Sequence, residues 1–458
     1  MRKKRLNKKQ CQQKHFEKRC LQRIGKIISQ KEIKKKIQNN KLEFIKAQSN
    51  RISLFKYIFE GVEYKVVYDK LRKQVVTIMY METKRRTKMI TIQKEPFLQA
   101  IKSVKSSIGK ASLQPILSTI HIKSENGGLT LTGTDINTSA RAVVEANVTE
   151  PVDICVNAEK LDLIISRLED IIILDIQDAM LVIKGGKAKF ELLTINSEEY
   201  PHPKFETNDN PIVLGGNAFT NGINKTIFST MQTDSQILNG VCLTLNGENG
   251  FEFASTDGNR LSQIKFNIPI KEQGQFTIPR KILTDIVKNN IKDEIKLYIN
   301  ENKTRITFEI ENCLYSSALL AGDYPKYQQL IPQKLPKEIV INKSALLHAL
   351  ETVAIMVDDR TNIANFKITK ENIELSSKSV DRGNAKDSLE LVNSKGIDDN
   401  STFMIAFNYK YLIECLKVFS NNVENIIIKM QNNNLSACII NGEGEENYLY
   451  LIMPCQIK

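Results

Sequence analysis

The chain has 458 residues, of which 41% are apolar and 26% are charged. This length predicts two to four domains rather than one core, and the apolar content argues against disorder over most of the chain. The net charge of +13 conceals two regions of opposite sign. Residues 1–88 carry 27 Lys and Arg against 7 Asp and Glu, whereas the remainder carries 38 against 45. No stretch approaches the roughly 18 consecutive apolar residues that a membrane-spanning helix needs.

Residues 1–88 form a basic N-terminal extension. Its first half is Lys-rich with a helical pattern, and residues 61–78 predict a two-stranded hairpin that turns at Asp69–Lys73. Three interpretations compete: a DNA-binding tail, an organelle targeting segment, or a translated upstream region with the mature start at Met89. Few Ser and a Lys-rich composition place targeting last, and the start at Met89 ranks first. No secretory apolar segment follows the basic start.

An internal repeat organises the rest of the chain. Amphipathic helices are expected at residues 96–108, 217–228 and 343–355, about one domain apart. After each of them come strands, a second helix that begins near Lys160, Lys281 or Lys410, and alternating strands again. The alternation of apolar and polar residues with Asn/Gly turns indicates antiparallel sheet. The sequence therefore predicts one α+β module present three times.

The second helices carry cations seven residues apart in every copy, which is about two turns, so each pair shares a helix face. For a single pair an ordinary solvated face is the better interpretation, but recurrence in an acidic body favours a basic surface for phosphates. These side chains, together with three from the first helices, are the candidate DNA-facing residues: Lys160, Arg167, Lys281, Lys288, Lys410, Lys417, Lys102, Lys105 and Lys225.

Apolar residues beside turns indicate a second surface. Most apolar side chains are core, but an exposed patch with a polar rim would bind a peptide. The candidates are Leu238, Leu261, Leu330, Leu435 and Leu451–Pro454. The loop from Thr256 to Leu261 is a further, weaker candidate that presents Arg260 to a ligand.

No catalytic constellation is present in the sequence. Asp135 and Asp257 both follow Thr at a strand end, where Asp commonly forms a local turn. With Arg260 they are candidate active-site groups for an alternative, a metal-dependent enzyme acting on nucleic acid. A second alternative is a DNA-compaction protein with a basic tail. Eight cysteines without a CxxC pair and four His predict buried thiols in a reducing compartment, no metal site and no cofactor.

From Met89 to Lys458 the sequence resembles the bacterial DNA polymerase III beta subunit family, the sliding clamps. The matching motifs occur in order along the body: Pro115-Ile-Leu117, Leu131-Thr-Gly-Thr-Asp135, Leu238-Asn-Gly240, Ser255-Thr-Asp-Gly-Asn-Arg-Leu261, Ile278-Pro-Arg-Lys281, Gly322-Asp-Tyr-Pro-Lys-Tyr327, Phe407-Asn-Tyr-Lys-Tyr411 and Met453-Pro454. Their order and coverage, together with the threefold repeat, make the resemblance specific.

The resemblance implies three tandem clamp domains, at residues 89–208, 209–334 and 335–458. Two chains would close head to tail into a six-domain ring around duplex DNA, with helices lining the hole. Such a ring is a non-catalytic processivity subunit of a DNA-directed DNA polymerase. It tethers the replicative polymerase, the clamp loader and repair proteins in the bacterial cytoplasm, at the replisome.

The resemblance also implies site residues. The peptide-binding cleft of the family would comprise Leu238, Thr256, Gly258, Asn259, Arg260, Leu261, Pro325, Leu330, Asn408, Tyr411, Leu435, Leu451, Met453, Pro454 and Cys455. Three departures leave the peptide preference open: Asn259 stands where His is usual, Gln329 where Arg is, and Cys455-Gln456 where Met-Arg is.

Two further sets of contacts follow from the same resemblance. In the subunit interface, Lys189, Phe190 and Leu192 on an edge strand would contact Ile355 and Met356 of the other chain. For DNA contact, Lys110 matches an exposed loop Arg, whereas Gln236 and Ile237 replace two Tyr, so that base stacking is lost there.

Overall fold

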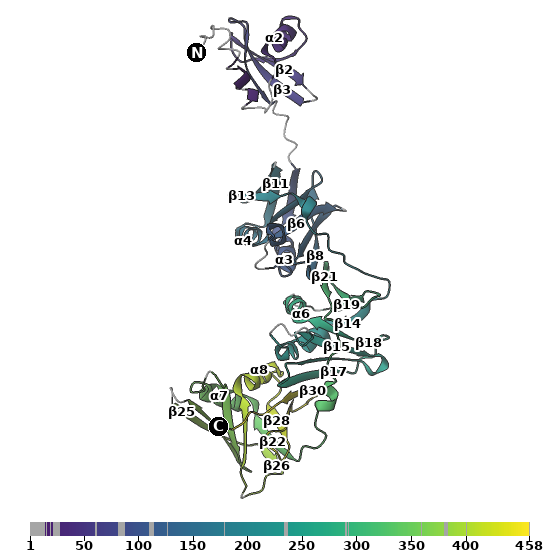
Figure 1. Cartoon of the computed structure of the whole chain (residues 1–458), viewed down its shortest axis with the longest axis vertical. Helices are drawn as coiled ribbons and strands as arrows, with labels where there is room; N and C mark the ends of the chain where they lie inside the picture. The colour runs from purple at the N-terminus through teal and green to yellow at the C-terminus, as the bar shows by residue number, and fades with distance from the viewer. Residues whose placement is uncertain are drawn as a thin grey trace, which may run out of the picture. The chain divides into compact units, whose positions relative to one another are not determined.

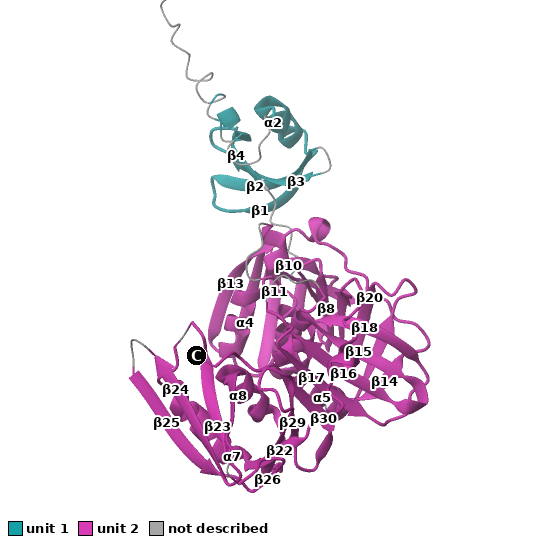
Figure 2. Ribbon diagram, turned by 60° about the horizontal axis from the view of Figure 1, so that its bottom comes forward, with its two compact units in different colours: residues 1–87 teal, residues 88–458 magenta. Residues whose placement is uncertain are grey.

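The computed structural model describes residues 14–457 except for residues 15, 19, 22–27, 60–61, 81–87, 110–113, 126, 178, 233–236, 289–290, 292, 359, 380–382 and 400. The chain divides into two compact units, unit 1 (Met1–Thr87) and unit 2 (Lys88–Lys458), coloured separately in Figure 2. No helix of the described part is both long and apolar enough to cross a membrane.

Unit 1 is a four-stranded antiparallel sheet with a helix packed on it. The helix α2 (Gln30–Gln38) begins after Ser29, whose Oγ accepts a hydrogen bond from the Glu32 N–H. The strands, in sheet order, are β1 (Glu43–Ala47), β2 (Ile52–Phe59), β3 (Val62–Asp69) and β4 (Gln74–Tyr80). Ile33 and Ile37 of α2 pack on Tyr57, Tyr64 and Val66 of the sheet. The predicted hairpin is confirmed by the pairing of β3 with β4.

Unit 2 repeats one arrangement three times: two four-stranded antiparallel sheets and two helices. In repeat 1 the first sheet has the order β10 (Asp153–Asn157), β6 (Thr119–Glu125), β7 (Gly128–Thr134) and β8 (Thr138–Glu145). The second sheet has the order β13 (Ala188–Ile195), β12 (Met180–Gly185), β11 (Ile171–Gln177) and β5 (Lys88–Gln93), with the short β9 (Asn147–Val148) beside β5.

Repeats 2 and 3 follow the same two strand orders. In repeat 2 the sheets are β18 (Gln273–Pro279), β15 (Gly240–Asn246), β16 (Phe251–Thr256) and β17 (Arg260–Phe266), then β21 (Cys313–Ala318), β20 (Arg305–Ile310), β19 (Glu294–Ile299) and β14 (Ile212–Gly215). In repeat 3 they are β27 (Phe403–Asn408), β23 (Ile363–Ile368), β24 (Asn372–Ser379) and β25 (Gly383–Glu390), then β30 (Glu445–Ile452), β29 (Cys438–Gly442), β28 (Asn425–Met430) and β22 (Lys337–Asn342), with β26 (Asn393–Lys395) beside β22.

Each repeat has two helices that cover its sheets (Figure 1). The first helices are α3 (Lys94–Lys105), α5 (Gly216–Asn224) and α7 (Lys343–Ala354), and the second are α4 (Ala158–Arg167), α6 (Arg280–Val287) and α8 (Tyr409–Val418). Short 3-10 turns are η1 (Pro115–Ser118), η2 (Ser197–Glu199), η3 (Ile227–Ser229), η4 (Gly247–Asn249) and η5 (Tyr327–Leu330).

The predicted apolar stripes of the first helices are confirmed as core. Phe97 and Ile101 of α3, Phe219 of α5, and Leu346 and Leu350 of α7 are all fully buried. Five cysteines are buried, and all seven in the described part are free thiols, as predicted.

The repeats are joined edge to edge by their sheets. Strand β8 of repeat 1 pairs with β21 of repeat 2, and β17 of repeat 2 pairs with β30 of repeat 3, both antiparallel. The corresponding strands at the two ends, β13 and β25, have no such neighbour among the described residues, although two residues of β13 pair with β10. Unit 2 therefore presents two edges of the kind that it uses internally.

Candidate functional site

The basic residues of the helices differ in how free their charges are. Lys102, Lys160, Arg167 and Lys410 are exposed and form no ion pair with a described residue. Lys105 pairs with Asp162, Lys281 with Asp135, Lys288 with Asp285 and Lys417 with Glu351. A paired Lys contributes less net charge to a surface, so among the predicted DNA-facing residues the four unpaired cations contribute most to the positive potential.

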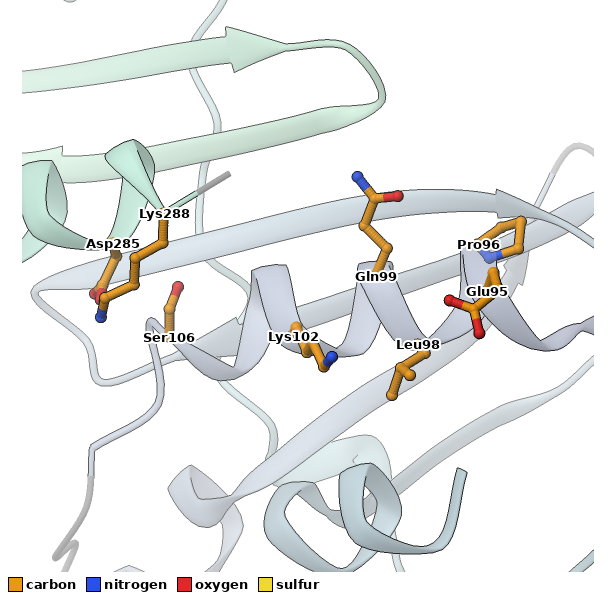
Figure 3. A pocket seen from close by; sticks show the side chains of 8 residues that line it. All are labelled: Glu95, Pro96, Leu98, Gln99, Lys102, Ser106, Asp285 and Lys288. Atoms are coloured by element: carbon orange, nitrogen blue, oxygen red, sulfur yellow. The ribbon is translucent and has the colours of Figure 1, made fainter. Parts of the chain in front are cut away.

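A hollow between repeats 1 and 2 is lined by cations and acids: Lys288 and Asp285 lie at one end, Lys102 near the middle and Glu95 at the other end (Figure 3). Helix α3 supplies Gln99 and Lys102, and helix α6 together with its C-cap supplies Asp285 and Lys288. The Nζ of Lys288 lies 3.2 Å from Oδ1 of Asp285. Burial raises the pKa of the Asp285 carboxyl, although Lys288 and Lys281 oppose this shift. Lys102 therefore carries the freer of the two positive charges in the hollow.

One predicted DNA-facing residue is placed elsewhere by the structure. Lys225, the C-cap of α5, is only 4% exposed. Its ammonium pairs with Glu445 of repeat 3 and lies 4.7 Å from the ring centroid of Tyr448. The prediction for Lys225 is wrong, because a buried, paired Lys joins two repeats and cannot contact a phosphate. Lys110 and Gln236 lie outside the described residues, and Ile237 packs at the edge of an apolar cluster.

The apolar cleft candidates converge at the junction of repeats 2 and 3. Leu261 of β17 lies opposite Leu451 of β30, and both are buried in a small cluster separate from the main core. This groove cluster consists of Cys242, Ala254, Leu261, Tyr324, Tyr327 and Leu451, with Leu238 and Ile331 packed against it. Around it, Leu330, Leu435 and Met453 are 61%, 48% and 39% exposed. Exposed apolar side chains around a buried apolar floor are typical of a peptide-binding groove.

The loop after β16 is held by its own side chains. The hydroxyl of Thr256 donates to the Arg260 carbonyl and accepts from the Gly258 N–H, at 2.6 and 3.1 Å. Oδ1 of Asp257 accepts the N–H groups of Asn259 and Arg260. Gly258 has a φ of +88°, which favours glycine. The Met453 N–H donates to the Asn259 carbonyl over 2.9 Å, so the loop is tied to the C-terminal segment that carries the rim.

Arg260 supports this site as a buried side chain. Its guanidinium is 5% exposed and bonds to Asp257, to Glu414 of α8 and to the Phe228 carbonyl, and it lies 4.1 Å from the centroid of Tyr411. Burial opposes its charge, but Tyr450, Glu414 and Asp257 outweigh burial and raise the pKa of Arg260. The expectation that the loop presents Arg260 to a ligand is therefore wrong for most of its donors, because they bond to Asp257 and the Phe228 carbonyl within repeat 2 and to Glu414 of repeat 3.

The remaining predicted cleft residues lie around the same junction. Asn408 caps α8 by accepting from the Lys410 N–H, and Cys455 donates its N–H to Ala406 of β27. Pro325 is exposed and precedes the buried Tyr327, whose N–H donates to the Pro325 carbonyl. Pro454 follows Met453 and is half-buried.

Sequence reasoning missed the supporting partners of the cleft. Tyr324 accepts the Thr256 N–H at its hydroxyl, Tyr327 donates to Glu252, and Glu414 and Glu445 receive the two buried cations. The motif Gly322-Asp-Tyr-Pro-Lys-Tyr327 was a usable signal for the two tyrosines. Nothing in the local sequence marks the two glutamates, because their partners are far away in the chain.

The edge strand β13 and the segment after α7 expose apolar side chains. On β13, Lys189 and Phe190 are exposed and Leu192 is half-buried, and Phe190 keeps 37% of its surface accessible. After α7, Ile355 is 69% exposed and Met356 is half-buried. Exposed apolar residues on an unpaired edge strand are typical of a pairing surface.

The carboxylates proposed for catalysis are not brought together. Asp135 bonds to Lys281 and to the N–H and hydroxyl of Thr138, whereas Asp257 bonds to Arg260 and its own loop. Among the described residues, no group of three or more His, Cys, Asp or Glu is arranged to hold a metal ion.

Comparison with known proteins covers unit 2 almost entirely. The N-terminal, central and C-terminal domain models of the DNA polymerase III beta subunit match residues 88–204, 213–326 and 328–456. A beta sliding clamp from Synechococcus elongatus is 29% identical over 356 residues, which are 75% of this chain and 92% of that protein. One from Bacillus subtilis is 27% identical over 383 residues, 80% of this chain and 98% of that protein.

Solved structures agree with these matches. The beta subunit from Thermotoga maritima superposes with a TM-score of 0.75 at 22% identity, covering 81% of this chain and all of that one. The sliding clamp from Bacillus subtilis superposes with a TM-score of 0.73 at 25% identity and the same coverage. The family models begin at residue 88, so unit 1 lies outside them.

Proposed function

The chain belongs to the DNA polymerase III beta subunit family, the beta sliding clamps, and we propose that two copies close head to tail around duplex DNA and hold the replicative polymerase on it. Members of this family are non-catalytic processivity subunits of the polymerase. A ring bound by topology needs only weak, salt-sensitive contacts, so it slides. The tethered polymerase then meets primer ends at high effective concentration.

The equivalence between the internal junctions and the free edges carries this proposal. Tyr315 of β21 lies opposite Ala140 of β8, and Tyr450 of β30 lies opposite Ser262 of β17. On the other side of these strands, Phe308 and Ile440 pair with the two tyrosines, just as Ile183 pairs with Phe190 on β13. Phe190 is therefore the counterpart of Tyr315 and Tyr450 on the free edge.

Burial differs among these three counterparts. Tyr315 and Tyr450 are 1% and 0% exposed, because the neighbouring repeat covers them, whereas Phe190 is 37% exposed. On β25 the counterpart of Ala140 and Ser262 is Ala385, which pairs with Ser377 as Ala140 pairs with Gly133. Pairing β25 of one chain with β13 of a second copy, Ala385 opposite Phe190, would bury Phe190 as the tyrosines are buried. Lys189, Leu192, Ile355 and Met356 belong to the same contact.

In this ring the helices face the DNA. Lys102, Lys160, Arg167 and Lys410 would contact backbone phosphates, with Lys105, Lys281, Lys288 and Lys417 contributing less because each has an acidic partner. Lysine binds phosphate as a point charge on a flexible stem, which suits contact without sequence preference. The acidic remainder of unit 2 repels DNA from the outside.

The groove between repeats 2 and 3 is the proposed docking site for short peptides of the polymerase, the clamp loader and repair proteins. Its floor is the groove cluster, and its apolar rim is Leu330, Leu435 and Met453. The ion pair of Arg260 with Glu414 holds repeats 2 and 3 in the relative position that creates the groove. The protein would act in the bacterial cytoplasm, where the chromosome is replicated.

Retention on DNA of different topology tests the function. The protein is loaded by a clamp-loading complex onto a nicked circular plasmid, and half the sample is then linearised. We expect the protein to remain on circles and to leave linear molecules by their ends. Equal loss from both would overturn the proposal.

A further inference from the structure

Unit 1 is a folded domain rather than a charged tail. Its helix and sheet enclose a core of their own that includes Ile33, Tyr57, Tyr64, Val66 and Ile78, all at most 1% exposed. The family match that defines the clamp function begins after it. Residues 1–88 nevertheless carry 27 Lys and Arg against 7 Asp and Glu, whereas the remainder of the chain has more acidic than basic residues. The question is what this excess charge contacts.

The acidic groups of the helix and sheet are neutralised within unit 1. Glu32 pairs with Lys36, and Lys56 lies 2.5 Å from Glu63 and 4.0 Å from Glu43. Asp69, 3% exposed, bonds to Nε of Arg51 at 2.9 Å and lies 3.9 Å from Nε of Arg72. The hydrogen bond from Arg51 holds the pKa of this carboxyl below its usual value.

Several of the exposed cations of unit 1 gather at one end of the sheet. The β3–β4 turn carries Lys70, Arg72 and Lys73, all exposed, and Arg51 of the β1–β2 turn lies beside it, since the Lys70 N–H donates to the Arg51 carbonyl over 2.8 Å. The Nε2 of Gln30 donates to the Val75 carbonyl over 2.7 Å. This contact places the start of α2, with the exposed Lys31, at the same end.

These residues, Lys31, Arg51, Lys70, Arg72 and Lys73, are called the basic tip. Two acids lie near it: Asp69 is buried beneath two arginines, and Glu32, in the first turn of α2, is paired with Lys36. Lys31, Lys70 and Lys73 form no ion pair within the described part of unit 1. Several uncompensated cations on a rigid turn form a site for a polyanion, whereas a single Lys would be an ordinary solvated side chain.

We propose that the basic tip of unit 1 binds the phosphodiester backbone of nucleic acid, as a contact separate from the ring. Nucleic acid is the polyanion that the rest of the chain also meets, so this inference uses the proposed function only to choose the partner. Lys and Arg that neutralise phosphates release counterions, so the binding must weaken steeply with salt. The contact needs neither a clamp-loading complex nor a closed ring.

The test uses the full chain without any loader, mixed with a labelled 20-nucleotide single strand or a 20-base-pair duplex. The variant Lys31→Glu/Lys70→Glu/Lys73→Glu removes the unpaired cations and leaves the Asp69 partners Arg51 and Arg72 in place. We expect affinity at low salt to fall at least tenfold. Each lost phosphate contact lowers the slope of log affinity against log salt by roughly 0.7 for a single strand and roughly 0.9 for a duplex. For three lost contacts, the slope should become shallower by about 2 for the single strand or about 3 for the duplex. The probe that binds more tightly identifies the strand form.

The matched control is Lys271→Glu/Lys303→Glu/Lys334→Glu, which makes the same change in net charge at exposed positions of unit 2. It should keep the affinity and salt slope of the parent. Equal losses in both variants, no loss in the tip variant, or binding to anionic lipid vesicles instead of oligonucleotides would overturn the inference. Thermal melting of both variants checks the fold. Retention of the tip variant on circular DNA tests the proposed function separately, because the ring does not depend on the tip.

Discussion

The two internal junctions of unit 2 use the same strand pairing but differ in chemistry. At the junction of repeats 1 and 2, Ser139 lies opposite Ser316, whereas at the junction of repeats 2 and 3 the corresponding pair is Leu261 and Leu451. The serine pair is fully buried, but the leucine pair forms the floor of the groove cluster beside exposed apolar residues. One backbone arrangement therefore serves as a plain joint in one place and, in our proposal, as a joint with a binding groove in another.

The free edges complete this comparison. The positions on β13 and β25 that correspond to the leucine pair are Glu191 and Asn384, which are polar and exposed. The free edges therefore offer Phe190 for pairing, but they have no apolar pair that could form the floor of a groove. We therefore expect one groove per chain, and four variants test this distinction between joint and groove.

The largest effect is expected for the buried ion pair at the junction of repeats 2 and 3. The side chains of Lys225 and Glu445 are 6% and 17% exposed, so Lys225→Met leaves a buried carboxylate without its partner. This should lower the stability of the junction by about 3–5 kcal/mol, measured by hydrogen exchange of β17 and β30.

Two control variants distinguish the loss of this ion pair from a general loss of stability. Lys225→Met/Glu445→Leu should recover most of the loss, because neither charge remains buried. Lys417→Met breaks a pair with Glu351 whose side chains are half exposed, and it should cost at most about 1 kcal/mol. If Lys225→Met lowered the stability of the junction by no more than Lys417→Met does, the Lys225–Glu445 pair would not stabilise the junction.

The second effect concerns the free edge. Phe190→Asp places a charge where the ring would bury an aromatic side chain, and we expect the dimer dissociation constant to rise at least about 100-fold, or about 2.8 kcal/mol. Sedimentation velocity measures this change. Val213→Asp, on the edge strand β14 and 41% exposed in the parent, is the control and should leave the dimer intact. A dimer unaffected by Phe190→Asp would exclude β13 from the interface.

The third effect concerns the groove. Met453→Asp should weaken binding of a short apolar peptide from the replicative polymerase by about 10- to 50-fold, because the rim loses its apolar contact and gains a charge to desolvate. Calorimetric titration measures the affinity, and Val392→Asp, at an exposed position outside the groove, should leave it unchanged. The dimer should persist in both variants, which separates groove from joint.

The smallest effect is a pH dependence of stability at the junction of repeats 1 and 2. Burial raises the pKa of Asp135, but the hydrogen bonds from Lys281 and Thr138 outweigh burial and lower it below 3.8. An acid of this kind stabilises the fold above its unfolded-state pKa, and the contribution disappears as the pH falls through the lower, folded-state pKa.

Asp135→Asn tests that contribution. The variant should be less stable than the parent by at most about 1 kcal/mol at pH 7. Thermal melting should show this difference shrinking as the pH falls below 3.8. A difference that stayed constant with pH would mean that Asp135 contributes through its shape rather than its charge.

Local patterns predicted much of the fold because helix and strand periods follow from neighbouring residues. The stripe of Phe97 and Ile101, the hairpin at Asp69 and the recurrence of the module were all available in the sequence. Whether a given charged side chain is buried or exposed could not be predicted from the sequence. Lys225 and Lys160 look alike in sequence, and only the distant Glu445, brought near by the pairing of β17 with β30, distinguishes a buried Lys from an exposed one. Lys160, by contrast, is exposed at the start of α4.

The apolar residues of the proposed groove were easier to identify than the residues that support them. Leu261, Leu451 and Met453 were candidates both from the apolar pattern beside turns and from the resemblance; Leu261 and Leu451 lie in one cluster, and Met453 is exposed. Arg260 was expected to face a ligand, but its partners Glu414 and Phe228 come from elements more than 30 residues away, which local sequence does not reveal.

Covalent closure of the free edges tests the ring most directly. In the proposed pairing of β13 with β25, residues 190 and 385 of two copies would lie opposite each other, at a Cα separation that suits a disulfide. The variant Phe190→Cys/Ala385→Cys, oxidised after loading onto nicked circles, should run as a covalent dimer and withstand a high-salt wash, whereas either single substitution should not cross-link. Linearising the DNA should release the cross-linked dimer. If oxidation yields no covalent dimer, or if the dimer is washed from circular DNA as readily as from linear DNA, the chain does not encircle the duplex through these edges.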